Sequence, residues 1–255
     1  MPVLPILSLL LMQQLAPTSL EQDRLAVCQG AARRDPAAAI LTASEWEKES
    51  VGPDRSAPRQ CLGLAYVSLL RWEAAELSFL SARAALEQGD PAARARLAAM
   101  AGNAALAGGR ADAALTDFDT ALADLAPAGA ITLAGEVAAD RARALVALGR
   151  NDDAAAALAQ ARRDAPQLTS AWLLSATLAR RMEDLAGAQQ FIETAATLAP
   201  LDPAVGLEAG VIAVLAGRDD AARASWNSVL AAAPDSAEAT TARNYLKQLQ
   251  EGAPQ

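Results

Sequence analysis

The sequence predicts an all-α fold in which helical hairpins stack into a solenoid, and three observations predict it. First, Pro166, Pro200 and Pro234 stand 34 residues apart, and the segments between them repeat. Second, 53% of the residues are apolar but only 4% are aromatic, because alanine, a strong helix former, supplies much of the apolar total. Third, no stretch alternates β-branched or aromatic residues between turn residues, so strand signals are absent. Such hairpins must stack to bury their apolar faces, and the stack leaves a curved surface that can hold another molecule.

Each repeat carries a small residue and a large one at matching positions of its second helix. The alanines are Ala75, Ala114, Ala154, Ala188 and Ala222, and four residues after each come Phe79, Phe118, Leu158, Ile192 and Trp226. Small residues let two helices approach closely, and large residues fill the space between them. The alanines are separated by 39, 40, 34 and 34 residues. The extra residues fall in the turn-like segments 88–91 and 126–129, so we expect longer connections between intact hairpins.

Helix ends are marked by proline, aspartate and glycine. Asp-Pro pairs at 35–36, 90–91 and 202–203 are typical of an N-cap followed by a first-turn proline. The 34-residue prolines end second helices, because proline has no N–H and its ring clashes with the preceding turn. Gly149 and Gly217 lie in the turn inside a hairpin.

These residues also resemble the tetratricopeptide repeat family, whose pattern is W-x2-L-G-x2-Y, then A-x3-F, then a closing P. The segment 62–66 (Leu-Gly-x-x-Tyr) and the segment 75–79 (Ala-x-x-x-Phe) reproduce two parts of it. Trp172 and the three prolines supply the rest in other copies. The resemblance covers about residues 56–236, with a weaker copy at about 20–50. It implies a right-handed superhelix, an α-solenoid of helix-turn-helix repeats with a C-terminal capping helix, of an exported bacterial type.

We expect five segments along the chain. They are a signal peptide at 1–18, a divergent helical hairpin at 19–55, tetratricopeptide repeats at 56–236, a capping helix at 237–250 and a tail at 251–255. The signal peptide is predicted because residues 3–15 form an apolar run without charge that is too short to span a membrane, with small residues after it. No Lys or Arg precedes this run, so the alternative is an uncut helix that caps the first repeat. The first interpretation places the protein in the periplasm of a Gram-negative bacterium, and the second in the cytoplasm.

The two cysteines, Cys28 and Cys61, are 33 residues apart, which is nearly one repeat. Equivalent positions on consecutive first helices face each other, so we predict a disulfide between them. A disulfide would fit an oxidising compartment. The alternative is two buried thiols that pack as small apolar residues.

Composition argues against catalysis, metals and nucleic acids. The chain has no histidine, so it lacks the commonest general base and metal ligand. The acidic pairs 152–153 and 219–220 fall where second helices begin, and negative charge is favoured there by the helix dipole. A net charge of −8 and a pI near 4.7 disfavour nucleic-acid binding. We therefore predict no catalytic residue, no metal and no cofactor.

The resemblance further implies that first helices line a concave groove for a protein partner. It assigns partner binding to Asn103, Arg143, Leu173, Thr177, Arg180 and Arg181. Some family members bind a terminal carboxylate with a set of lysines and asparagines that is not reproduced here. Asn103 matches one position, but Asp140 stands where the next asparagine is expected, so the resemblance does not imply that activity for this chain. Our hypothesis is that the three arginines contact carboxylates of a peptide. The alternative is that they pair with Glu136 and Glu183.

The predicted function is a non-catalytic protein-protein interaction scaffold. Alternatives are an accessory protein that binds peptidoglycan or another envelope polymer, and a cytoplasmic scaffold whose N-terminus is not cut. At the C-terminal end, Leu207, Val211, Val214 and Leu215 would make the groove apolar, unless the helix at 237–250 covers part of 211–215.

Overall fold

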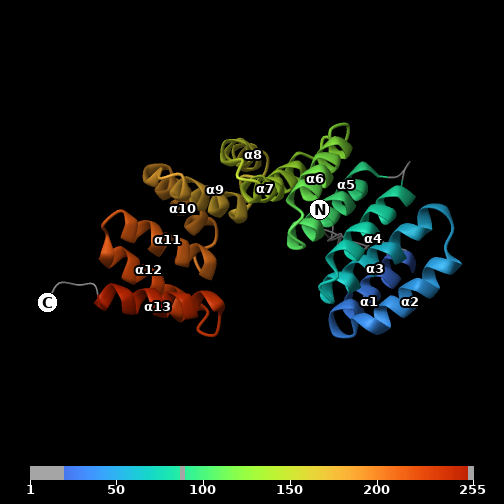
Figure 1. Ribbon diagram of the computed structural model, residues 1–255, viewed down its shortest axis with the longest axis horizontal. Helices are drawn as coiled ribbons and strands as arrows, with labels where there is room; N and C mark the ends of the chain where they lie inside the picture. Colours follow the sequence, from blue (N-terminus) through green and yellow to red (C-terminus); the bar gives the residue numbers. More distant parts are fainter. Residues whose placement is uncertain (1–19, 87–89, 252–255) are drawn as a thin grey trace, which may run out of the picture.

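The computed structural model describes residues 20–86 and 90–251, and every regular element in these two ranges is a helix (Figure 1). The elements are α1 (Leu20–Arg34), α2 (Pro36–Glu49), the 3-10 helix η1 (Gly52–Arg55), α3 (Ser56–Ser68), α4 (Trp72–Ala85), α5 (Pro91–Ala107), α6 (Ala111–Leu125), α7 (Ile131–Ala147), α8 (Asn151–Asp164), α9 (Thr169–Arg181), α10 (Leu185–Leu198), α11 (Pro203–Leu215), α12 (Asp219–Ala232) and α13 (Ala237–Glu251). The all-α solenoid expected from the sequence is confirmed. The signal peptide expected at 1–18 lies outside the described residues.

The helices follow one another around an open arch, with α1 and α2 at one end and α13 at the other (Figure 1). Six antiparallel hairpins make up the described part of the arch, from α1–α2 to α11–α12. The second helix of each hairpin packs against the first helix of the next, so each hairpin is buried only by its neighbours.

Glycines of the first helices allow bulky rings of the second helices to reach the hairpin core. A Cβ atom on Gly102 would lie 2.8 Å from the Phe118 ring, closer than real Cβ contacts allow. The same overlap occurs between Gly63 and Phe79 and between Gly210 and Trp226. In the two hairpins whose large residues are Leu158 and Ile192, the equivalent first-helix positions are the buried Ala142 and Ala176. The branched aliphatic side chains leave room for a methyl group, whereas the aromatic rings do not.

The turn inside each of the five hairpins from α3–α4 to α11–α12 has one backbone geometry. The first residue past the C-cap is in the left-handed region, and the N–H of the next residue donates to the carbonyl five residues back. Glycine holds this position in three hairpins, and Leu70 and Glu183 hold it in the other two, with φ of 56° and 66°. This is the Schellman arrangement, which satisfies carbonyls at the end of the first helix.

The predicted Asp-Pro helix starts are confirmed. Asp35 accepts a hydrogen bond from the N–H of Ala38 at 3.0 Å, and Asp90 accepts one from Ala92 at 2.9 Å. Asp202 caps α11 in the same way, and Pro203 follows it at the first helical position. These caps satisfy backbone donors that a helix start leaves open.

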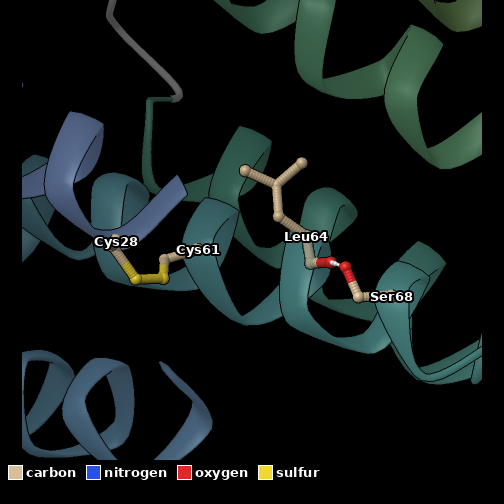
Figure 2. Close-up of a disulfide and its surroundings, with 4 residues drawn as sticks. All are labelled: Cys28, Cys61, Leu64 and Ser68. Carbon is tan, nitrogen blue, oxygen red and sulfur yellow. Dashed lines mark hydrogen bonds between the residues drawn. A yellow bond between two sulfur atoms is a disulfide. The ribbon is translucent and has the colours of Figure 1, made fainter. Parts of the chain in front are cut away.

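The two ends of the arch are closed differently. At the N-terminal end, Cys28 of α1 and Cys61 of α3 are joined by a disulfide with a Cα–Cα distance of 6.0 Å (Figure 2). At the C-terminal end, the ring centroids of Tyr245 on α13 and Trp226 on α12 lie 5.2 Å apart. Helix α13 shares an apolar cluster with Leu207, Val211 and Val214 of α11, which were expected to extend the groove, whereas Leu215 is 53% exposed. The final helix therefore covers part of 211–215, as the capping alternative expects.

Candidate functional site

The first helices of consecutive hairpins approach one another along one side of the arch. Helix α5 contacts α7, α7 contacts α9, and α9 contacts α11. A curved stack brings helices closest on its inner side, so these four helices line the concave surface. The six partner-binding residues expected from the sequence all lie on α5, α7 and α9.

A groove of about 140 Å³ lies between α7 and α9, with Leu158 of α8 at its base. Its lining is apolar apart from Thr177 and two arginines, Arg143 on α7 and Arg181 on α9. The other lining residues are Ala142, Val146, Leu174 and Leu178. The structure thus brings three of the six expected residues together around an apolar floor.

Asn103, Asp140 and Arg143 form a hydrogen-bonded group that joins α5 to α7. The Nδ2 of Asn103 donates to Oδ2 of Asp140 at 2.8 Å. Nη1 of Arg143 donates to Oδ1 of Asn103 and to Oδ1 of Asp140, both at 3.3 Å. The Arg143 side chain remains 49% exposed, so it keeps donors for another group while its charge is partly balanced. The missing second asparagine is thus replaced by an acid that orients both neighbours.

Arg180 and Arg181 are adjacent in sequence but differ in electrostatic environment. Arg180 makes a two-pronged ion pair with Glu208 of α11, with Nε 2.6 Å from Oε1, and both side chains are largely buried. Its charge is therefore compensated within the protein and ties α9 to α11. Arg181 is exposed at the groove, and no ion pair involves it in residues 20–86 and 90–251. The arginines that do pair use acids other than the expected Glu136 and Glu183.

Leu173, the remaining expected residue, lies on α9 beside the groove. It packs against the core cluster that contains Ile192, Val205 and Ile212, so it joins two hairpins. Sequence reasoning missed Glu208 as the partner of Arg180. The only signal for it was an acidic residue on the next first helix, 28 positions away.

The described residues also bear on metal ligation, membrane spans and shifted pKa values. In the described ranges no cluster of three or more His, Cys, Asp or Glu side chains is placed to hold a metal ion. No helix there is both long and apolar enough to cross a bilayer. Marked pKa shifts fall on Asp117 and Arg162, neither of which lines the α7–α9 groove.

No protein-family model matches the sequence, and neither does any curated protein. Solved structures do match over most of the chain. PilW, a widely conserved type IV pilus biogenesis factor, is 19% identical, with a TM-score of 0.70 over 88% of this chain and 99% of its own. TTC0263, a thermophilic tetratricopeptide repeat protein of Thermus thermophilus, is 19% identical, with a TM-score of 0.59 over 76% of this chain and 98% of its own.

The fold is therefore a tetratricopeptide-like α-solenoid. YrrB, a tetratricopeptide repeat protein with an unusual peptide-binding site, has the same architecture, with a TM-score of 0.50 at 20% identity over 81% of this chain and 98% of its own. At these identities the likeness shows the tetratricopeptide-like fold alone, and function has to be inferred from this chain's own residues.

Proposed function

We propose that this tetratricopeptide-like solenoid is a non-catalytic scaffold that binds a segment of another protein in its concave groove. The observation that carries the proposal is the α7–α9 groove, where an apolar floor lies next to Arg181, a cation with no ion-pair partner in the described part of the chain. An apolar floor accepts aliphatic side chains, and an uncompensated guanidinium accepts a carboxylate in bidentate fashion. The matching ligand is a peptide that presents an aliphatic residue next to an acidic one.

Each expected residue then has a distinct role. Arg181 and Thr177 contact the peptide, and Arg143 adds a second cation that Asn103 holds in place. Arg180 and Leu173 act on the shape of the groove, because both join α9 to the hairpin that follows it. The packed helices form the apolar floor without a ligand, so binding has to order only the exposed side chains of Arg143 and Arg181.

We place this activity in the periplasm, after removal of residues 1–18. The support is the apolar N-terminal run together with a disulfide between Cys28 and Cys61, since disulfides persist in oxidising compartments. In this proposal residues 19–55 form an N-terminal hairpin stapled to the repeats, residues 56–236 carry the groove, 237–250 cap the stack and 251–255 form the tail. PilW, which is similar in fold, is a type IV pilus biogenesis factor.

The experiment begins with a photo-crosslinking amino acid at position 177, in the groove, and a second one at Thr194, on α10, as the control. A protein captured in its host only from position 177 supplies the peptide for affinity measurements. We expect Arg181→Glu to weaken binding of that peptide roughly tenfold or more, the loss typical of a charged hydrogen-bonded contact. Arg163→Glu, on the exposed side of α8, makes the same charge change away from the groove and should leave the affinity unchanged. Equal affinities for both variants would refute the proposal.

A further inference from the structure

A second cavity lies on the other side of α9, away from the concave groove. It measures about 320 Å³, is open on one side, and is lined by residues of α8, α9, α10 and the turn between α9 and α10. Leu158 and Leu178 line both the cavity and the groove, so they form the wall between them. Most of the lining is apolar, and the polar members are Arg162, Ser175 and Asp184.

Arg162 reaches from α8 across the cavity to α9 and α10. Its Cζ lies 4.2 Å from the ring centre of Phe191 and 5.4 Å from that of Trp172. Its Nη1 donates to Oγ of Ser175, whose own hydroxyl donates to the carbonyl of Ala171 at 2.6 Å. Of the five donors of a guanidinium, this arrangement uses one. Within residues 20–86 and 90–251, no carboxylate lies within ion-pair distance of Arg162.

The equivalent arginine of an earlier repeat has a carboxylate partner that Arg162 lacks. Arg83 and Arg162 each stand eight residues after the repeat alanine of their helix. Arg83 is held by Asp124 of the next second helix, with Nε–Oδ2 at 2.6 Å and Nη2–Oδ1 at 2.8 Å. On α10 the position that matches Asp124 is occupied by Leu198.

A second acidic residue near Arg83 also has an apolar equivalent on α10. Asp117, whose charge also interacts with Arg83, corresponds to Phe191 on α10. Both acids that face Arg83 are thus replaced by apolar residues where Arg162 stands. The pKa of Arg162 is lowered, first by burial and then by the neighbouring charge of Arg163. A cation in an apolar cavity is stabilised by an anion that enters from outside.

We propose that this cavity binds the carboxyl-terminal residue of a polypeptide, with its carboxylate on Arg162 and an aliphatic side chain in the cavity. The cavity is at the lower end of the size range of ligand pockets, which suits a single residue. Asp184 lines the rim and uses Oδ1 to cap α10 through the N–H of Gly187. Its second oxygen can accept the N–H of the bound residue. The Arg162 guanidinium complements the terminal carboxylate, the Asp184 carboxylate complements the N–H, and the apolar lining complements the aliphatic side chain.

The test uses N-acetyl-leucine as the probe and N-acetyl-leucinamide as the probe without a carboxylate. Binding to the full chain is followed by NMR, from the Arg162 Nε–Hε and the Trp172 indole signals. We expect saturable shifts with the acid, at the millimolar affinity that so few atoms allow, and binding of the amide that is roughly tenfold weaker or more. Hexanoate, which has a carboxylate but no N–H, should also bind more weakly.

Four variants locate the binding. Arg162→Gln should weaken binding of N-acetyl-leucine roughly tenfold or more, because it removes the charge and keeps much of the length of the side chain. Arg163→Gln removes a charge beside the cavity and should bind as the unmodified chain does. Arg181→Gln removes the groove cation, and loss of binding by this variant but not by Arg162→Gln would place the probe in the groove and overturn the inference. Leu198→Asp restores the internal acid found beside Arg83, so it should suppress binding while leaving the circular dichroism unchanged.

Several results would overturn the inference. They are the absence of any shift with the acid, equal affinity for the acid and the amide, or full binding by Arg162→Gln. Equal or tighter binding of hexanoate would refute the assignment to a polypeptide end. If Arg162→Gln does not fold, Leu198→Asp decides, since undiminished binding by that variant would show that Arg162 is not the contact.

Discussion

Replacing Asp117 by asparagine should stabilise the fold at neutral pH, and the effect should vanish in acid. Asp117 lies on α6, is 7% exposed and has an Oδ2 atom without a hydrogen-bond partner in the described part of the chain. Burial raises its pKa to about 6, and the negative charge of Glu76 on α4 adds to the rise. Arg110, which pairs with Glu76, and Arg83 act in the opposite direction.

The magnitude follows from the two pKa values of Asp117. The unfolded chain ionises this carboxyl at its ordinary pKa of 3.8, and the folded chain at about 6. Between these values the folded state binds more protons, so the free energy of unfolding falls as pH rises through the window. The difference of about two pKa units corresponds to roughly 3 kcal/mol, present below pH ~4 and lost above pH ~6. Asparagine has almost the same shape and no charge, so it escapes this loss.

The assay is urea unfolding of the unmodified chain and of Asp117→Asn at several pH values from 4 to 8. We expect the difference in unfolding free energy to grow by up to ~3 kcal/mol across that range in favour of the variant. Asp119→Asn, on the same helix but at an exposed carboxylate, removes one charge and controls for net charge. The reasoning is refuted if the two variants show the same pH dependence, or if Asp117→Asn loses stability as pH rises.

Two further predictions concern stability. Replacing Cys28 and Cys61 by serine removes a link across 33 residues, which the chain-entropy model values at about 3–4 kcal/mol of unfolding free energy. Hydrogen exchange should rise first in α1 and α2. A uniform rise along the chain would contradict this prediction. Glu183→Gly relieves a left-handed backbone that costs a non-glycine residue about 1–2 kcal/mol. Glycine loses more backbone entropy on folding, which offsets about 0.5–1 kcal/mol, so a net stabilisation of roughly 0.5–1 kcal/mol is expected. Thermal unfolding measures it against Gly149→Ala, which should lose stability at the equivalent turn, and a loss in both variants would show that the turn geometry is not the cause.

Much of the fold follows from the sequence because each hairpin is specified locally and then repeated. The position four residues after each repeat alanine predicts the large core residue, and Phe79, Phe118 and Trp226 are all buried there. The Asp-Pro pairs predict helix starts for the same reason, since a cap depends only on residues within one turn. Leu70 and Glu183 escaped prediction because no residue type marks them. The hydrogen bonds of the turn impose the left-handed backbone there without glycine.

The electrostatics of the candidate groove could be predicted only in part. The resemblance to the repeat family predicted that Arg143, Arg180 and Arg181 lie on first helices, and the structure has them there. Whether each charge is compensated depends on acids elsewhere in the stack. Arg180 meets Glu208 of the next hairpin, whereas Arg181, one position on, pairs with no acid in the described ranges. Side-chain direction and the offset between hairpins decide this, and neither is written in a local pattern.

Equivalent positions in different repeats therefore carry information that a single position does not. In a solenoid each repeat meets its neighbour in nearly the same way, so a residue that is satisfied in one repeat shows what its equivalent requires in another. Arg83 shows that an arginine at this place needs a carboxylate from the next second helix, and α6 supplies Asp124. Helix α10 supplies Leu198 instead, yet an arginine is present as Arg162 and is shielded by Phe191. Stability alone would favour an apolar residue at such a place, so a cation in an apolar cavity is better explained by a ligand than by packing.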